Sequence, residues 1–163
     1  MTSPHGASSD AEAAARLPLL VHGATLLVFF AGAAAPTPLY RLYQIEWHTS
    51  PAMITFIFAV FAFSLLISLL IAGSLSDHVG RRPVVFAALV LQACAMGMFV
   101  LADGTGGLIA ARIAQGFATG IAVSSLGAAL VDDHEIRGAN VSGLAPLVGM
   151  GVGALVSGAL VTY

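Results

Sequence analysis

The sequence has very little charge and no lysine at all. Of its 163 residues only 9% are Asp, Glu, Lys or Arg, while 58% are hydrophobic. Soluble domains carry roughly a quarter of their residues as charged side chains, so this composition excludes a water-exposed globular fold. Six arginines and a net charge of −2 form no basic patch, which excludes a nucleic-acid partner. The composition is that of a protein embedded in a lipid bilayer.

Cysteine and the residue patterns of enzymes are also scarce. Cys94 is the single cysteine and lies in an apolar run, so no disulfide framework is possible. The sequence contains no cluster with metal-ligand spacing, no phosphate-binding loop and no nucleophile–base arrangement. We therefore predict that the protein is not an enzyme and holds neither a metal nor a cofactor.

Long apolar runs are present instead. Five of them have the roughly 20 residues that a helix needs to cross the hydrocarbon core of a bilayer. Short polar connections separate them, which forces neighbouring helices to run antiparallel. We predict an all-α, polytopic transmembrane helix bundle over 17–163, preceded by a disordered cytoplasmic leader over 1–16. The expected helices are 17–39, 51–72, 83–102, 107–131 and 141–163.

The first apolar run has a second interpretation. It ends in Ala33-x-Ala35, which resembles a signal-peptidase site behind an apolar core. The leader, however, contains Asp10 and Glu12, and the run is long for a signal peptide. We favour a retained helix, and a mature chain that lacks the residues before Pro36 would establish the signal peptide instead.

The arginines predict the orientation of the bundle. With a cytoplasmic N-terminus, the inner segments hold Arg16, Arg81, Arg82 and Arg137, and the outer loops hold only Arg41. This distribution satisfies the positive-inside rule. Tyr40, Tyr43 and Trp47 would then lie at the outer interface of the membrane. We expect a multi-pass protein of the cell (inner) membrane.

The connection between the second and third runs concentrates charge in a tight turn, GSLSDHVGRR at 73–82. Asp77 falls at the C-terminal end of a helix, where the helix dipole disfavours a carboxylate unless a cation or another helix N-terminus compensates it. Gly73 leaves room for a second helix, and Gly80 permits the positive φ of a sharp reversal. The two arginines that follow place cations at headgroup level. These residues also fit an ordinary loop that only fixes topology.

The fourth run contains an arginine, Arg112. A guanidinium at the bilayer centre costs roughly 2.5–3.5 kcal/mol, so it needs a partner inside the bundle or a path to water. Gly116 and Gly120 follow at intervals of four, and such a stripe of small residues packs against another helix. We expect Arg112 to point into the bundle, with Gln115 near enough to share a polar partner. The alternative is that Arg112 snorkels to the outer interface.

Two further features carry weaker signals. The fifth run is rich in glycine, and Gly149, Gly153 and Ser157 form a line that close helix packing accounts for. His22, near the inner end of the first run, is of the residue type that titrates near physiological pH. One histidine at such a place is more often a hydrogen-bonded packing residue.

These patterns resemble those of the major facilitator superfamily. The family's loop between helices two and three carries Gly-x-Leu-x-Asp-x-x-Gly-Arg-Lys/Arg, and the matching residues here are Gly73, Leu75, Asp77, Gly80, Arg81 and Arg82, with His78 where Arg is common. ARIAQGFATG at 111–120 is similar to the helix-four motif Arg-x-x-Gln-Gly. The fifth run matches the exporters' Gly-x-x-x-Gly-Pro-x-x-Gly-Gly only in part: Gly149, Gly153 and Gly158 fit, whereas Ala154 and Ser157 replace Pro and Gly.

The resemblance implies more than five helices, because the family has two six-helix halves with the substrate between them. It implies a partial N-terminal half that lacks its second half. It also implies a conformational latch, in which Arg81 pairs with Asp132 or Asp133 and Asp77 faces a helix end of the absent half. Arg112 would serve proton coupling or organise the cavity.

Two functions remain open at this point. The first is a secondary active transporter, or a truncated fragment of one, that moves a small solute with protons, with efflux of a drug or metabolite as one possible direction. Few intramembrane charges argue against a highly charged solute. The second is a non-transporting integral membrane protein derived from a truncated transporter gene.

Overall fold

The computed structural model describes residues 4–162, with side chains described for 17–73 and 79–161. Over 4–162 the chain is helical and has no strand. The helices are α1 (Pro4–Ala34), α2 (Tyr40–Glu46), α3 (Pro51–Val79), α4 (Arg81–Leu101), α5 (Thr105–Asp133) and α6 (Glu135–Thr162). All except α2 contain a stretch long and apolar enough to cross a membrane. The predicted all-α membrane bundle is confirmed.

The first helix differs from the expectation at both ends. It begins at Pro4, so residues 4–16, expected to be disordered, are helical and continue directly into the apolar part. This segment is rich in Ala, the best helix former, which favours a helix without any hydrophobic signal. The helix ends at Ala34 rather than at Leu39, because the prolines of the APTP stretch that follows cannot continue it.

A short helix, α2, occupies the connection that the sequence predicted as a loop. It is too short and polar to give a hydropathy signal. Tyr43 on this helix stacks on Trp47 just beyond it, with ring centroids 4.6 Å apart. Tyr40 is buried and packs with Ile57, Phe99 and Leu108. These aromatic residues, which the sequence predicts at the membrane interface, anchor α2 to the bundle.

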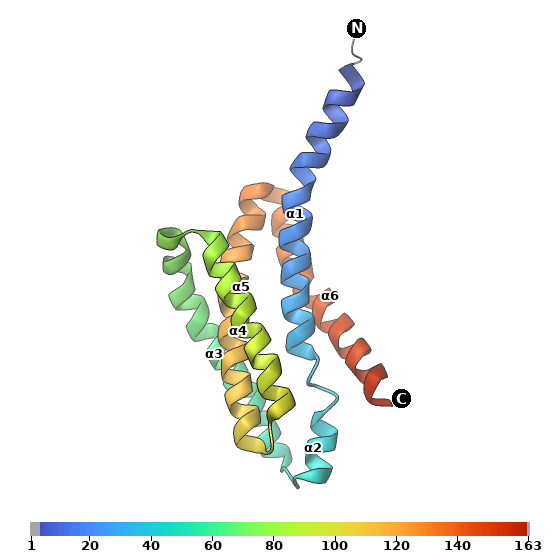
Figure 1. The fold of residues 1–163 in the computed structure, drawn as a ribbon, viewed down its shortest axis with the longest axis vertical. Coiled ribbons are helices and arrows are strands. Elements are labelled where there is room, and N and C mark those ends of the chain that lie inside the picture. Colours follow the sequence, from blue (N-terminus) through green and yellow to red (C-terminus); the bar gives the residue numbers. More distant parts are fainter. Residues whose placement is uncertain (1–3, 163) are drawn as a thin grey trace.

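The other four long helices, α1, α3, α4 and α6, pack around α5. Figure 1 shows the α3–α4 and α5–α6 turns at one end of the bundle, from which the N-terminal part of α1 extends. This end is called the α5–α6 end below. The turn between α4 and α5 lies with α2 at the other, the α2 end (Figure 1).

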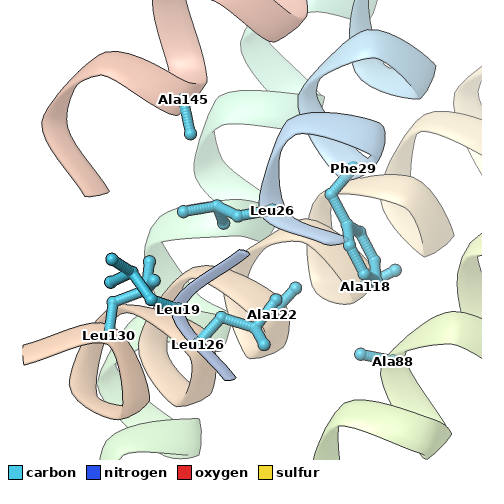
Figure 2. Close-up of a cluster of buried hydrophobic side chains, with 9 residues drawn as sticks. All are labelled: Leu19, Leu26, Phe29, Ala88, Ala118, Ala122, Leu126, Leu130 and Ala145. Atoms are coloured by element: carbon cyan, nitrogen blue, oxygen red, sulfur yellow. The ribbon is translucent and has the colours of Figure 1, made fainter. Parts of the chain in front are cut away.

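Alanines and leucines of α5 lie at the centre of the core. Figure 2 shows the apolar cluster between α1 and α5, where Leu26 and Phe29 of α1 lie over Ala118 and Ala122 of α5. The cluster also contains Leu19, Ala88, Leu126, Leu130 and Ala145. Alanines on α5 let the neighbouring backbones approach closely, which is how helices gain packing contacts inside a bilayer.

Glycine permits the close approach of α5 to α3. A Cβ on Gly116 would lie 2.6 Å from the Phe61 carbonyl oxygen of α3, and a Cβ on Gly120 would lie 2.6 Å from that of Leu65. Gly149 and Gly153 abut the α1 backbone in the same way. The glycine stripes of the fourth and fifth apolar runs therefore pack against α3 and α1.

Candidate functional site

Arg112 is the centre of a buried polar site on α5. Its exposed fraction is 1%, although it lies in the apolar segment of a long helix. The Gly116 and Gly120 side of α5 faces α3, which leaves no exit to lipid along that face. The structure places Arg112 inside the bundle, as the stripe of small residues indicates, and not at the outer interface.

The guanidinium of Arg112 is held by three hydrogen bonds. Its Nε donates to the Tyr40 hydroxyl at 2.6 Å, and its Nη1 donates to the Ala33 carbonyl at 2.9 Å. The same Nη1 donates to the Gln115 Oε1 at 2.5 Å, so the polar partner expected at i+3 is a direct contact. Gln115 in turn donates from Nε2 to the Gly32 carbonyl at 3.0 Å.

The end of α1 explains why these carbonyls are available. The last carbonyls of a helix have no intrahelical partner. Pro36 stands four residues after Gly32 and has no N–H to donate, and Thr37 bonds to Ala34 instead. Arg112 and Gln115 supply the missing donors. A cation also complements the partial negative charge at a helix C-terminus.

Aromatic rings surround the same guanidinium. The Arg112 Cζ lies 5.3 to 5.4 Å from four ring centroids, which is within the range of cation–π attraction. The rings belong to Tyr40, Phe58, Phe61 and Phe99. Burial raises the pKa of Tyr40 more than the nearby Arg112 lowers it, so this ring stays a neutral phenol. The cage comes from α2, α3 and α4.

No carboxylate neutralises Arg112 among the side chains that the structure describes. Its Nη2 is buried and has no hydrogen-bond partner. Dipoles and ring faces therefore compensate the charge, and one strong donor stays unused. A buried cation of this kind is poised to bind an anionic or carbonyl oxygen, because an unsatisfied charged donor is costly to leave unpaired.

A second polar cluster lies where α5 ends. The Arg81 Nη2 is 2.5 Å from the Asp132 Oδ2, and the His22 Nδ1 is 2.7 Å from the Asp133 Oδ2. The resemblance implies that Arg81 pairs with Asp132 or Asp133, and in the structure its partner is Asp132. The neighbouring Asp133 contacts His22 of α1, for which the sequence suggested either a titrating role or, more often, that of a hydrogen-bonded packing residue. Two consecutive carboxylates thus connect α5 to α4 and to α1.

The other residues of the expected latch differ in what they do. Gly80 has the predicted positive φ, 91°, and forms the reversal between α3 and α4. Arg82 is exposed, and no described carboxylate lies within salt-bridge distance of it. A Cβ on Gly73 would meet Ser124 Oγ at 3.8 Å, an ordinary contact, so packing does not require glycine there. The side chain of Asp77 lies outside the described residues.

Gly158 also departs from the expectation. The partial exporter motif grouped it with Gly149 and Gly153, which both abut the α1 backbone. A Cβ on Gly158 would meet only a ring carbon of Pro38, at 3.9 Å. Two of the three glycines therefore set the α1–α6 distance, because α6 diverges from α1 toward its C-terminal end (Figure 1).

Sequence reasoning missed the partners that make the Arg112 site. The sequence predicted Tyr40 only as an aromatic residue at the membrane interface. The other partners are the backbone carbonyls of Gly32 and Ala33, which no side-chain pattern indicates. The available clue was Pro36, since a proline four residues after a helical residue leaves that residue's carbonyl free. A polar side chain elsewhere must then satisfy it.

Comparison with known proteins identifies the family. Residues 22–163 match the model of the Major Facilitator Superfamily, and this range includes both polar clusters. Neither a curated protein nor a solved structure matches the chain. With five helices able to cross a membrane, the match indicates a multi-pass membrane protein with a function of the transporter type. The chain therefore belongs to the major facilitator superfamily.

Proposed function

We propose that this chain forms part of a secondary active transporter that moves a small solute in exchange or together with protons. The observation that carries the proposal is Arg112: a cation with an exposed fraction of 1%, no described carboxylate partner and a buried Nη2 without a hydrogen bond. Charged residues inside membrane bundles mark ion and substrate pathways. The second six-helix half that the family resemblance implies would close the solute pathway.

The proposed role of Arg112 follows from its contacts. It connects the end of α1, through the Ala33 carbonyl, to α2, through the Tyr40 hydroxyl. A solute oxygen, or a carboxylate that loses its proton, would attract the guanidinium and weaken those bonds. Arrival of a ligand would thereby loosen the outer end of α1. This is a route by which charge at one residue moves a helix.

The proposed latch between Arg81 and Asp132 is weaker than the buried Arg112 site. Arg81 and Asp132 have side chains 35% and 64% exposed, so water screens their attraction. Such a pair is worth about 1 kcal/mol or less. It would orient the ends of α4 and α5 rather than hold the bundle together. In the proposed orientation this end faces the cytoplasm of a cell whose inner membrane holds the protein.

The test is transport in liposomes by the full-length transporter that contains this chain, because the second half closes the solute pathway. Vesicles containing a pH-sensitive dye are given a pH gradient, and lipophilic, weakly charged solutes are added outside. We expect a solute-dependent pH change with the wild type and none with Arg112→Ala. Arg112→Lys should rescue poorly, because one ammonium cannot reproduce a planar fork of donors. Arg41→Ala, which removes an exposed arginine of α2, is the matched control.

The same assay separates the alternative. A correctly inserted full-length wild type, with both halves present, that produces no solute-dependent pH change would favour the non-transporting membrane protein. Wild-type flux by Arg112→Ala would refute the coupling role and leave the arginine a packing function only. Insertion is checked by helical content and by the accessibility of Cys94 to a thiol reagent, since that cysteine is exposed on α4.

A further inference from the structure

The α5–α6 end contains a histidine–carboxylate contact that the proposed transport function does not use. The His22 Nδ1 lies 2.7 Å from the Asp133 Oδ2, and the two residues are 111 positions apart in the chain. Their side chains are 33% and 21% exposed. This contact is the polar link between α1 and the last turn of α5.

The surroundings of His22 admit water. A cavity of about 600 Å³ opens at this end, and its wall includes His22, Asp133, Arg81 and Arg82. The cavity lies between α1 and α4, which both pack on α5 with little direct contact between them. An imidazole in this wall can exchange protons with solvent, unlike the Arg112 site.

The charges facing His22 come from two helices. From α5 they are Asp133 in direct contact and Asp132 beside it, and from α4 they are Arg81 and Arg82. Among described side chains, α6 contributes no titratable group to the cavity wall. The side chains of 1–16 and 74–78 lie outside the described residues. Since Arg81 is already paired with Asp132, the carboxylate left for His22 is Asp133.

We propose that His22 and Asp133 form a proton-binding site that sets how firmly α1 is attached to α5. In neutral form, His22 donates one hydrogen bond from Nδ1 to the carboxylate. When Nε2 takes up a proton from solvent, the imidazole becomes a cation and the same contact becomes a charge-assisted pair. Charge-assisted hydrogen bonds are roughly twice as strong as neutral ones. Acidification therefore tightens the α1–α5 link, and alkalinisation loosens it.

Below this site, the described side chains form no second polar contact between α1 and α5 near the α5–α6 end. Leu19, Leu26, Leu126 and Leu130 fill the space between α1 and α5 on this side of the Arg112 cluster. Apolar contacts in a bilayer gain no hydrophobic driving force, so α1 and α5 are held there by packing alone. The contact between His22 and Asp133 therefore restrains the movement of α1 relative to α5 more than any single apolar contact at this end.

The experiment is a double-mutant cycle on the full chain, unfolded by SDS in mixed micelles at pH 5.5 and pH 8. His22→Gln and Asp133→Asn are measured singly and together. We expect the coupling between the two positions to be larger at pH 5.5, by about two- to fivefold in the unfolding equilibrium constant, as suits a partly exposed ion pair. Coupling that is equal at both pH values would overturn the proposal.

Two further variants distinguish proton binding from simple packing. His22→Lys carries its charge at both pH values, so its coupling to Asp133 should persist while the pH dependence disappears. His134→Gln removes an exposed histidine at the same end and should keep the wild-type pH dependence. Loss of the pH dependence in His134→Gln, or its survival in His22→Lys, would assign the titration to another group. None of these readouts requires transport.

Discussion

Packing of α5 against α3 makes the sharpest stability prediction, because Gly116 leaves no space for a methyl group. A Cβ at this position would lie 2.6 Å from the Phe61 carbonyl oxygen and 2.7 Å from the Ser64 Cβ. Both neighbours belong to the α3 backbone or sit directly on it, so they cannot turn aside. Gly116→Ala must push the two helices apart, and overpacking of this kind costs about 1–3 kcal/mol.

The matched control is Gly127→Ala, eleven residues further along the same helix. A Cβ there would meet only the Ser142 Oγ, at 3.5 Å, which is an ordinary contact. Both substitutions gain helix propensity, about 1 kcal/mol in favour of Ala, and this gain cancels in their comparison. The free energy of unfolding should therefore be lower for Gly116→Ala than for Gly127→Ala by about 1–3 kcal/mol.

The assay is reversible unfolding by SDS in mixed micelles, followed by circular dichroism and by fluorescence of Trp47, the single tryptophan. Gly127→Ala should match or exceed the wild type in stability. If Gly116→Ala were as stable as Gly127→Ala, the close α3–α5 contact would be wrong, and the glycine stripe would not determine how these helices pack.

Three other predictions use the same bundle. Tyr40→Phe removes the acceptor of the Arg112 Nε and should lower the free energy of unfolding by about 1–3 kcal/mol, the cost of an unsatisfied buried donor, in the same SDS assay. Burial raises the pKa of Tyr40 above its ordinary 10.0, so the free energy of unfolding of the wild type should fall as the pH rises through and above 10. Tyr40→Phe should reduce that fall, and the absorbance of the phenolate follows the titration. On α6, Gly153→Ala should destabilise the protein while Gly151→Ala, which faces open space, should not, as unfolding in the same SDS assay followed by circular dichroism would show.

The sequence alone determined the class of fold and the location of its membrane helices. A bilayer offers no water to unpaired backbone groups, so long apolar runs must be helices, and hydropathy with length locates them. It did not determine the helical segments that lie outside the apolar runs. The Ala-rich leader and α2 have no hydropathy signal, and their ends depend on local propensity and on the prolines after Ala34.

Part of the candidate site could likewise be predicted from the sequence, and part of it required the tertiary structure. Arg112 and its glycine stripe could be identified from the sequence, because a cation in an apolar run is costly and glycines at intervals of four share a face. The groups that accept hydrogen bonds from this cation could not be identified from the sequence, because Tyr40 and Ala33 are 72 and 79 positions away in the chain. The pairing of two adjacent aspartates with Arg81 and His22 likewise required coordinates. Periodicity tells which face a residue occupies, whereas only the packing of α1 and α4 on α5 decides which partner it meets.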